Sequence, residues 1–152
     1  MTVLGVVVVP GGKNPRVHGA ILEGTLAEPR VIASFELRTA SAEPSEQAVD
    51  LARHLSPKLI SAGIKRAGMR VAGTTPVARR SKVAFSRAHC EGAILFVLRE
   101  TLGNSVVIVE PVSAPKAIGL KKAELEAILD TLASKGVNRD AVLAALAVLA
   151  DL

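Results

Sequence analysis

The residues that could carry chemistry are few and lie far apart along the chain. His18, His54 and His89 fall in different predicted elements and lack the spacing of a metal-ligand set. His89 stands next to Cys90, but adjacent helix residues point in different directions and do not make a nucleophile and base pair. A buried structural role is the more common one for a single free cysteine, so we expect Cys90 to lie in the core.

The acidic and glycine-rich segments are equally sparse. Glu91 and Glu110 are isolated acids, from which no general acid/base pair can be argued. Asp140 stands at the start of a predicted helix, where an acid is favoured by the helix dipole. Gly11-Gly12-Lys13 lacks the spacing of a phosphate-binding loop and the Ser or Thr after the Lys, so it predicts a hairpin turn. The sequence therefore predicts no catalytic residue, no metal site and no cofactor.

Positive charge is concentrated in one part of the chain. Residues 51–90 carry nine Lys and Arg and no Asp or Glu, whereas the flanking parts are slightly acidic and the whole chain has a net charge of +5. Such an excess can attract polyanions, although surface Lys and Arg often only solvate helix faces and loops. The candidate nucleic-acid-binding residues are Lys65, Arg66, Arg70, Arg79, Arg80, Lys82 and Arg87.

Aromatic side chains are scarce, which limits how nucleic acid could be held. Phe35, Phe85 and Phe96 are the only aromatic residues, with no Tyr or Trp. Few rings are therefore available to stack on the bases of single strands. Binding would be directed at backbone phosphates and would be weakly specific and strongly salt-dependent.

The elements that would position these residues begin with strands. Apolar and β-branched patterns predict strands at residues 3–9, 16–23 and 30–38, with a turn at residues 10–15. Because the links are short, these three strands are expected to be antiparallel.

Helices and two further strands follow. A helix begins at Pro44 and is expected to restart at Ser56-Pro57, a pair typical of a helix N-terminus. The remaining predictions are a strand at 69–73, a long helix at 81–102, a strand at 105–109, a loop at 110–119 and helices at 121–134 and 138–151. The last helix is nearly free of charge after Asp140, so most of it should be buried against the sheet or another subunit.

This order of elements, and several short stretches, resemble the RuvC-type Holliday junction resolvases of the ribonuclease-H-like superfamily. The stretches are Val3-Leu4-Gly5-Val6 with Pro10-Gly11, residues 88–95 around an embedded Gly92, residues 109–119, and residues 140–147. The resemblance implies an α/β fold with a mixed five-stranded sheet, three antiparallel strands then two parallel, flanked by helices.

The resemblance also implies where a metal centre would lie. In that family an Asp on the first strand, a Glu on the strand after the first helix and two Asp on the last helix hold two divalent metals. In this sequence the first-strand Asp falls at about Val7, the Glu falls at one of residues 71–73, and the second Asp of the last helix falls at about Leu143. Asp140 alone could match one of the family's acids. Two-metal cleavage needs several hard oxygen ligands, which one carboxylate cannot supply. We therefore expect a degenerate member without metal-dependent nuclease activity.

Length and composition complete the expectations. The chain of 152 residues predicts a single domain covering residues 1–152. Its apolar runs are too short to span a bilayer, its start does not resemble a secretory signal, and its single cysteine suits the cytoplasm.

Three functions remain open at this point. The first is a non-catalytic protein that binds double-stranded or branched DNA through its basic face. The second is a protein–protein interaction or structural module, including a homodimer, that uses an apolar helix at residues 93–102 or 141–152. The third is an enzyme whose unrelated active site forms only in three dimensions.

Overall fold

The structure is a computed structural model and describes residues 1–11, 14–73, 81–134 and 136–152. Its sheet has five strands in the order β3-β2-β1-β4-β5. The strands are β1 (Thr2–Val9), β2 (Arg16–Gly24), β3 (Pro29–Leu37), β4 (Arg66–Arg70) and β5 (Val106–Val109). β1, β2 and β3 pair antiparallel, whereas β4 and β5 run parallel to β1. This confirms the predicted mixed sheet.

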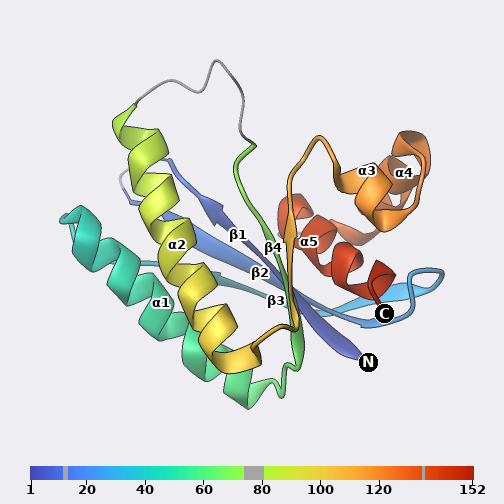
Figure 1. The fold of residues 1–152 in the computed structure, drawn as a ribbon, viewed down its shortest axis with the longest axis horizontal. Coiled ribbons are helices and arrows are strands. Elements are labelled where there is room, and N and C mark those ends of the chain that lie inside the picture. The colour runs from blue at the N-terminus through green and yellow to red at the C-terminus, as the bar shows by residue number, and fades with distance from the viewer. Residues whose placement is uncertain (12–13, 74–80, 135) are drawn as a thin grey trace.

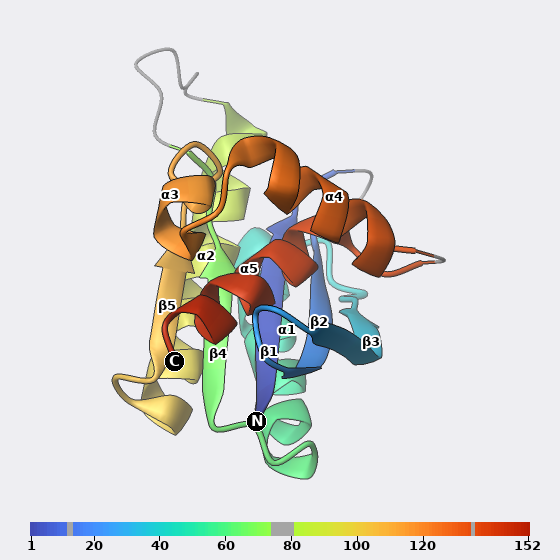
Figure 2. The ribbon, with the colours of Figure 1, turned by 90° about the vertical axis from the view of Figure 1, so that its right-hand side faces the viewer.

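Helices cover both faces of the sheet (Figures 1 and 2). They are α1 (Pro44–Ser61), α2 (Lys82–Leu102), α3 (Ala114–Ile118), α4 (Lys122–Leu132) and α5 (Arg139–Ala150). β1 alternates between the two sides: Leu4, Val6 and Val8 pack with α1 and α2, whereas Val3 and Val7 pack with α3, α4 and α5. In the described part of the chain, no helix combines the length and apolarity needed to cross a membrane.

Helix α5 lies very close to the sheet because two glycines face it. A Cβ on Gly5 would lie 1.9 Å from the Ala141 carbonyl oxygen, and a Cβ on Gly68 would lie 2.1 Å from the Ala144 carbonyl oxygen. The helix residues that face the two glycines are Ala141, Ala144 and Ala145, whose small side chains allow the close packing. Every residue from 141 to 149 is buried. The expected burial of the last helix is therefore confirmed, with the sheet as the surface that covers it.

Three sequence predictions of local structure are wrong. Helix α1 continues through Pro57 instead of restarting there, because Leu51, Leu55 and Leu59 remain on one buried stripe. Strand β4 is Arg66–Arg70 and not 69–73, since the small residues Ala67 and Gly68, which lie before the predicted start, also pair with β1 and β5. A short helix, α3, lies within the segment predicted as a loop, with Ala114 and Ile118 in the core.

Candidate nucleic-acid interface

One transverse row of the sheet lies near the carboxyl ends of the parallel strands. Val7 of β1 is paired with Arg70 of β4 on one side and with His18 of β2 on the other, and Arg70 is in turn paired with Val109 of β5. Paired residues of neighbouring strands point to the same face, and Val7 and Val109 both pack in the core with α5. Arg70 therefore lies beside the buried Val7 on the face covered by α5.

Asp140, in the first turn of α5, lies next to the Arg70 end of this row. Its Oδ1 lies 3.8 Å from Nε of Arg70, and the Arg70 side chain is largely covered. The helix start is fixed by Asn138, whose Oδ1 accepts hydrogen bonds from the backbone N–H groups of Asp140 and Ala141. The corner formed by β1, β4 and α5 thus contains an apolar side chain and an Arg–Asp ion pair.

The other two positions suggested for metal ligands carry no acid either, since residues 71–73 are Val, Ala and Gly and the last position is Leu143. Leu143 is buried against the sheet. Among residues 1–11, 14–73, 81–134 and 136–152, no group of three or more His, Cys, Asp or Glu side chains could hold a metal ion. Residues 12–13, 74–80 and 135 contain none of these four residue types in the sequence.

The predicted basic residues are not all brought together. Lys65 and Arg66 lie at the amino end of β4, whereas Arg70 lies at its carboxyl end, roughly 13 Å further along the strand. Lys82 and Arg87 lie in the first turns of α2. Arg79 and Arg80 lie outside the described residues.

Three of these basic side chains already have acidic partners in the protein. Arg66 pairs with Asp151 just after α5, Arg70 pairs with Asp140, and Arg87 Nε lies 3.6 Å from Glu91 Oε2 one helical turn away. Lys65 and Lys82, by contrast, are exposed and make no ion pair with any described residue. The positive charge free to meet a polyanion is thus smaller than the sequence alone indicates.

Glu91 has a structural role that sequence reasoning missed. Besides facing Arg87, its carboxylate accepts a hydrogen bond of 3.0 Å from the backbone N–H of Ala72, which follows the end of β4. This hydrogen bond connects α2 to the segment that follows β4. The spacing of Arg87 and Glu91 was visible in the sequence, but nothing in the sequence indicated Ala72 as the other partner.

Cys90 is fully buried, as expected. It packs with the side chains that α1 and α2 place against the sheet, and burial raises the pKa of its thiol, with a smaller contribution from the nearby Glu91 carboxylate. His89 is exposed on the surface of α2. The two neighbours therefore form no nucleophile and base pair.

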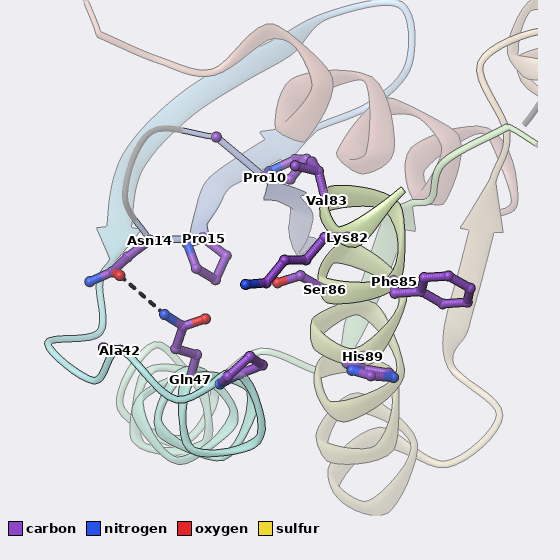
Figure 3. A pocket seen from close by; sticks show the side chains of 12 residues that line it. Pro10, Asn14, Pro15, Ala42, Gln47, Lys82, Val83, Phe85, Ser86 and His89 are labelled. Atoms are coloured by element: carbon purple, nitrogen blue, oxygen red, sulfur yellow. Dashed lines mark hydrogen bonds between the residues drawn. The ribbon is translucent and has the colours of Figure 1, made fainter. Parts of the chain in front are cut away.

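A pocket of about 350 Å³ opens on the other face of the sheet, between the ends of α1 and α2 and the connection after β1 (Figure 3). Its floor includes the side chain of Gln47, which is only 5% exposed. Lys82 and Ser86 point from α2 toward Asn14 and Gln47. The residues that line it are Pro10, Gly11, Asn14, Pro15, Ala42, Pro44, Gln47, Lys82, Val83, Phe85, Ser86 and His89.

Comparison with known proteins bears on the fold. No protein-family model matches the sequence, and no curated protein matches it either. Among solved structures, Thermus thermophilus RuvC in complex with a Holliday junction substrate superposes with a TM-score of 0.69 at 17% identity, covering 97% of this chain and 92% of that one. Another structure of Thermus thermophilus RuvC gives a TM-score of 0.67 at 19% identity, with the same coverage.

This chain has a RuvC-like ribonuclease-H fold. The agreement extends over nearly the whole of both chains, and the strand order and helix placement described above are those of the RuvC-like arrangement. At 17–19% identity the likeness establishes the RuvC-like fold and leaves the activity to be argued from the side chains.

Proposed function

We propose that this protein binds the phosphate backbone of duplex or branched DNA on its RuvC-like scaffold and does not cleave it. The observation that carries the proposal is the Arg70–Asp140 ion pair beside Val7. It lies at the corner of β1, β4 and α5, where the resemblance to RuvC-type resolvases would place the metal-binding acids. A guanidinium there is not a metal ligand, and it occupies the one carboxylate of the corner.

The chemistry of this corner argues against hydrolysis by two metals. Such a reaction needs ions roughly 3.5–4 Å apart that stabilise both the attacking and the leaving oxygen. Val7 and Leu143 offer no side-chain oxygen, and the one acid of the corner, Asp140, faces an arginine. A divalent cation placed there would meet a like charge and a single carboxylate.

The charge distribution supports binding of a polyanion. Lys65 and Lys82 are exposed without an acidic partner among the described residues, and Arg79 and Arg80 add two charges just before Lys82 in the sequence. Lysine and arginine that neutralise phosphates release counterions, which favours association. Because Thermus RuvC was solved with a Holliday junction substrate, a four-way junction is the natural first probe.

A fluorescence-anisotropy titration tests the proposal. Labelled duplex, four-way junction and single-stranded DNA are titrated at about 50 mM and about 200 mM salt, between which even two phosphate contacts should weaken the affinity about tenfold. The variant with Arg79, Arg80, Lys82 and Arg87 all changed to Gln should bind more weakly and show a shallower salt dependence. Lys121→Gln with Lys122→Gln, two exposed lysines at the start of α4, is the control.

The titration can refute the proposal in two ways. If no DNA changes the anisotropy at low salt, the protein does not bind nucleic acid through its charge. If the quadruple variant binds like the wild type, the interface lies elsewhere on the surface.

A second function, a protein–protein interaction module, is favoured by one observation. Val83, Phe85 and Phe96 on α2 are each more than half exposed. Helix α5, the other apolar helix considered, is covered by the sheet within the same chain. A light-scattering mass of twice the monomer would support an α2-mediated homodimer, and a monomer mass at high concentration would contradict it.

A further inference from the structure

The pocket between α1, α2 and the β1–β2 connection is a candidate ligand site separate from the Arg70–Asp140 corner. It lies on the side of the sheet that α1 and α2 cover, whereas Asp140 belongs to α5 on the opposite side. Its volume of about 350 Å³ lies at the small end of the range usual for sites of small organic ligands. It is therefore suited to a ligand of the size of one nucleotide.

The floor of the pocket presents a fixed hydrogen-bond acceptor. Nε2 of Gln47 donates to Oδ1 of Asn14 at 3.1 Å and to the backbone oxygen of Ser41 at 2.8 Å. Asn14 is held in turn, because its Nδ2 donates to the backbone oxygen of Thr39 at 2.8 Å. With its nitrogen engaged on one side, the Gln47 amide turns its oxygen toward Lys82 and Ser86 (Figure 3).

That oxygen lines the open pocket and is available to a donor that enters it. Gln47 is 5% exposed, and none of the described residues donates a hydrogen bond to its Oε1. The rest of the Gln47 side chain is held by its neighbours, so the position of this acceptor is fixed before any ligand binds. A ligand with an N–H group that reaches the floor of the pocket would satisfy it.

The opposite wall presents a cation and a hydroxyl. Lys82 and Ser86 are four residues apart on α2 and so lie on the same face of the helix. Lys82 has no acidic partner among the described residues, and the first turn of α2 contains no acid. A cation at the positive end of a helix dipole is unfavourable for the helix alone, so a bound anion would stabilise this end.

We propose that this pocket binds a nucleotide, with the N–H groups of the base directed to Oε1 of Gln47 and the phosphate directed to Lys82 and Ser86. Pro10, Pro15 and Val83 supply apolar surface on which a planar base can pack. The same chemistry is offered by a free mononucleotide and by an unpaired nucleotide at the end of a DNA strand. Lys82 is shared with the proposed DNA-binding residues, whereas Gln47 and Ser86 are not among them, so Ser86→Ala tests this pocket separately from backbone binding.

The test uses dAMP, deoxyadenosine and inorganic phosphate as separate probes of the full chain. In ¹H–¹⁵N spectra, dAMP should shift the side-chain amide resonances of Gln47 and Asn14, whereas deoxyadenosine and phosphate alone should bind at least about tenfold more weakly. Ser86→Ala and Lys82→Gln, at positions that are not buried, should each weaken dAMP binding. Lys122→Gln on α4 should leave it unchanged.

Two DNA probes then separate the sources of the nucleotide. A duplex with one unpaired 3′ adenine should compete with dAMP if the pocket takes a strand end, and a blunt duplex should not. If dAMP binds and neither duplex competes, the ligand is the free nucleotide. If dAMP leaves both amide resonances in place, or if Ser86→Ala and Lys82→Gln both bind dAMP like the wild type, the inference is wrong, whether or not the protein binds DNA elsewhere on its surface.

Discussion

Arg70, the last residue of β4, faces Asp140 of α5 across 3.8 Å, from Nε to Oδ1, beside the buried side chain of Val7. This contact joins two segments that are 70 positions apart in the sequence. The proposed function takes this corner of β1, β4 and α5 as the counterpart of a resolvase metal centre, with a guanidinium in place of a carboxylate. The structure therefore suggests how acids could be introduced and their effect measured.

Changing Val7 to Asp and Arg70 to Glu should create a metal site next to Asp140. Without metal the double variant should be less stable than the wild type by about 3 kcal/mol or more, because an acid replaces a core valine. Saturating Mn²⁺ should then raise its melting temperature by about 5 °C or more, because the metal binds only the folded state. Differential scanning calorimetry with and without Mn²⁺ measures this.

The wild type is the control for that experiment, and its melting temperature should not respond to Mn²⁺. If the double variant is unfolded without metal, circular dichroism during a Mn²⁺ titration gives the same information. An equal rise in the wild type would mean that it already holds a metal, which contradicts the proposed reading of this corner.

Gly68→Ala should destabilise the protein by about 3 kcal/mol, because the added methyl would overlap the Ala144 carbonyl oxygen of α5. Gly5→Ala should behave in the same way against Ala141. The measurement is the free energy of unfolding in urea. Gly92→Ala is the matched control: it lies within α2 with open space around it, so it should stabilise by up to about 1 kcal/mol.

If Gly68→Ala were as stable as the wild type, the Ala144 carbonyl oxygen of α5 could not lie so close to Gly68.

Cys90 should be almost unreactive in the folded protein. Its side chain is inaccessible, and burial raises the pKa of the thiol, so little thiolate is present near neutral pH. A thiol-reactive dye should label the native protein at the rate of unfolding or local opening and label the denatured protein at once. Fast labelling of the native protein would show that α2 does not cover this residue.

His18 should make the stability depend on pH. Burial lowers its pKa, with Arg16 and Arg38 acting in the same direction and Glu36 opposing them. The unfolded chain, with the ordinary value of 6.5, therefore takes up a proton before the folded protein does. The free energy of unfolding should be highest above that value, fall as the pH drops through it, and level off once folded His18 is also protonated.

Urea denaturation at about pH 7.5 and about pH 5.5 measures this effect. The wild type should lose more stability on acidification than His18→Gln, which cannot take up the proton. If both lose the same amount, His18 does not contribute.

The fold could be predicted from the sequence because its strongest signals are local. The apolar runs of β1 and β2 and the short links between the first strands predict the antiparallel part of the sheet. The absence of charge from α5 after Asp140 indicates that this helix is buried. The restart predicted at Pro57 is wrong because the buried stripe of Leu51, Leu55 and Leu59 outweighs the helix-breaking effect of proline. The small residues Ala67 and Gly68 of β4 do not form an apolar run, so the predicted strand begins at residue 69 instead of residue 66.

The candidate sites were less predictable because they depend on long-range contacts. The sequence predicts that Arg66 and Arg70 face DNA, but their acidic partners Asp151 and Asp140 lie at the two ends of α5, which only folding brings near β4. The same holds for the pocket, where Asn14 and Gln47 are 33 residues apart. A count of charges along a chain reports how many are present and not how many are already paired.

The central claim, binding without cleavage, is tested most directly by one reaction examined on two gels. A labelled four-way junction is incubated at low salt with excess protein and Mg²⁺ or Mn²⁺, and each sample is divided between a native and a denaturing gel. We expect a shifted band on the native gel and full-length strands on the denaturing gel. Strands cut in a metal-dependent manner by the wild type, and not by a preparation of Asp140→Asn, would contradict the account.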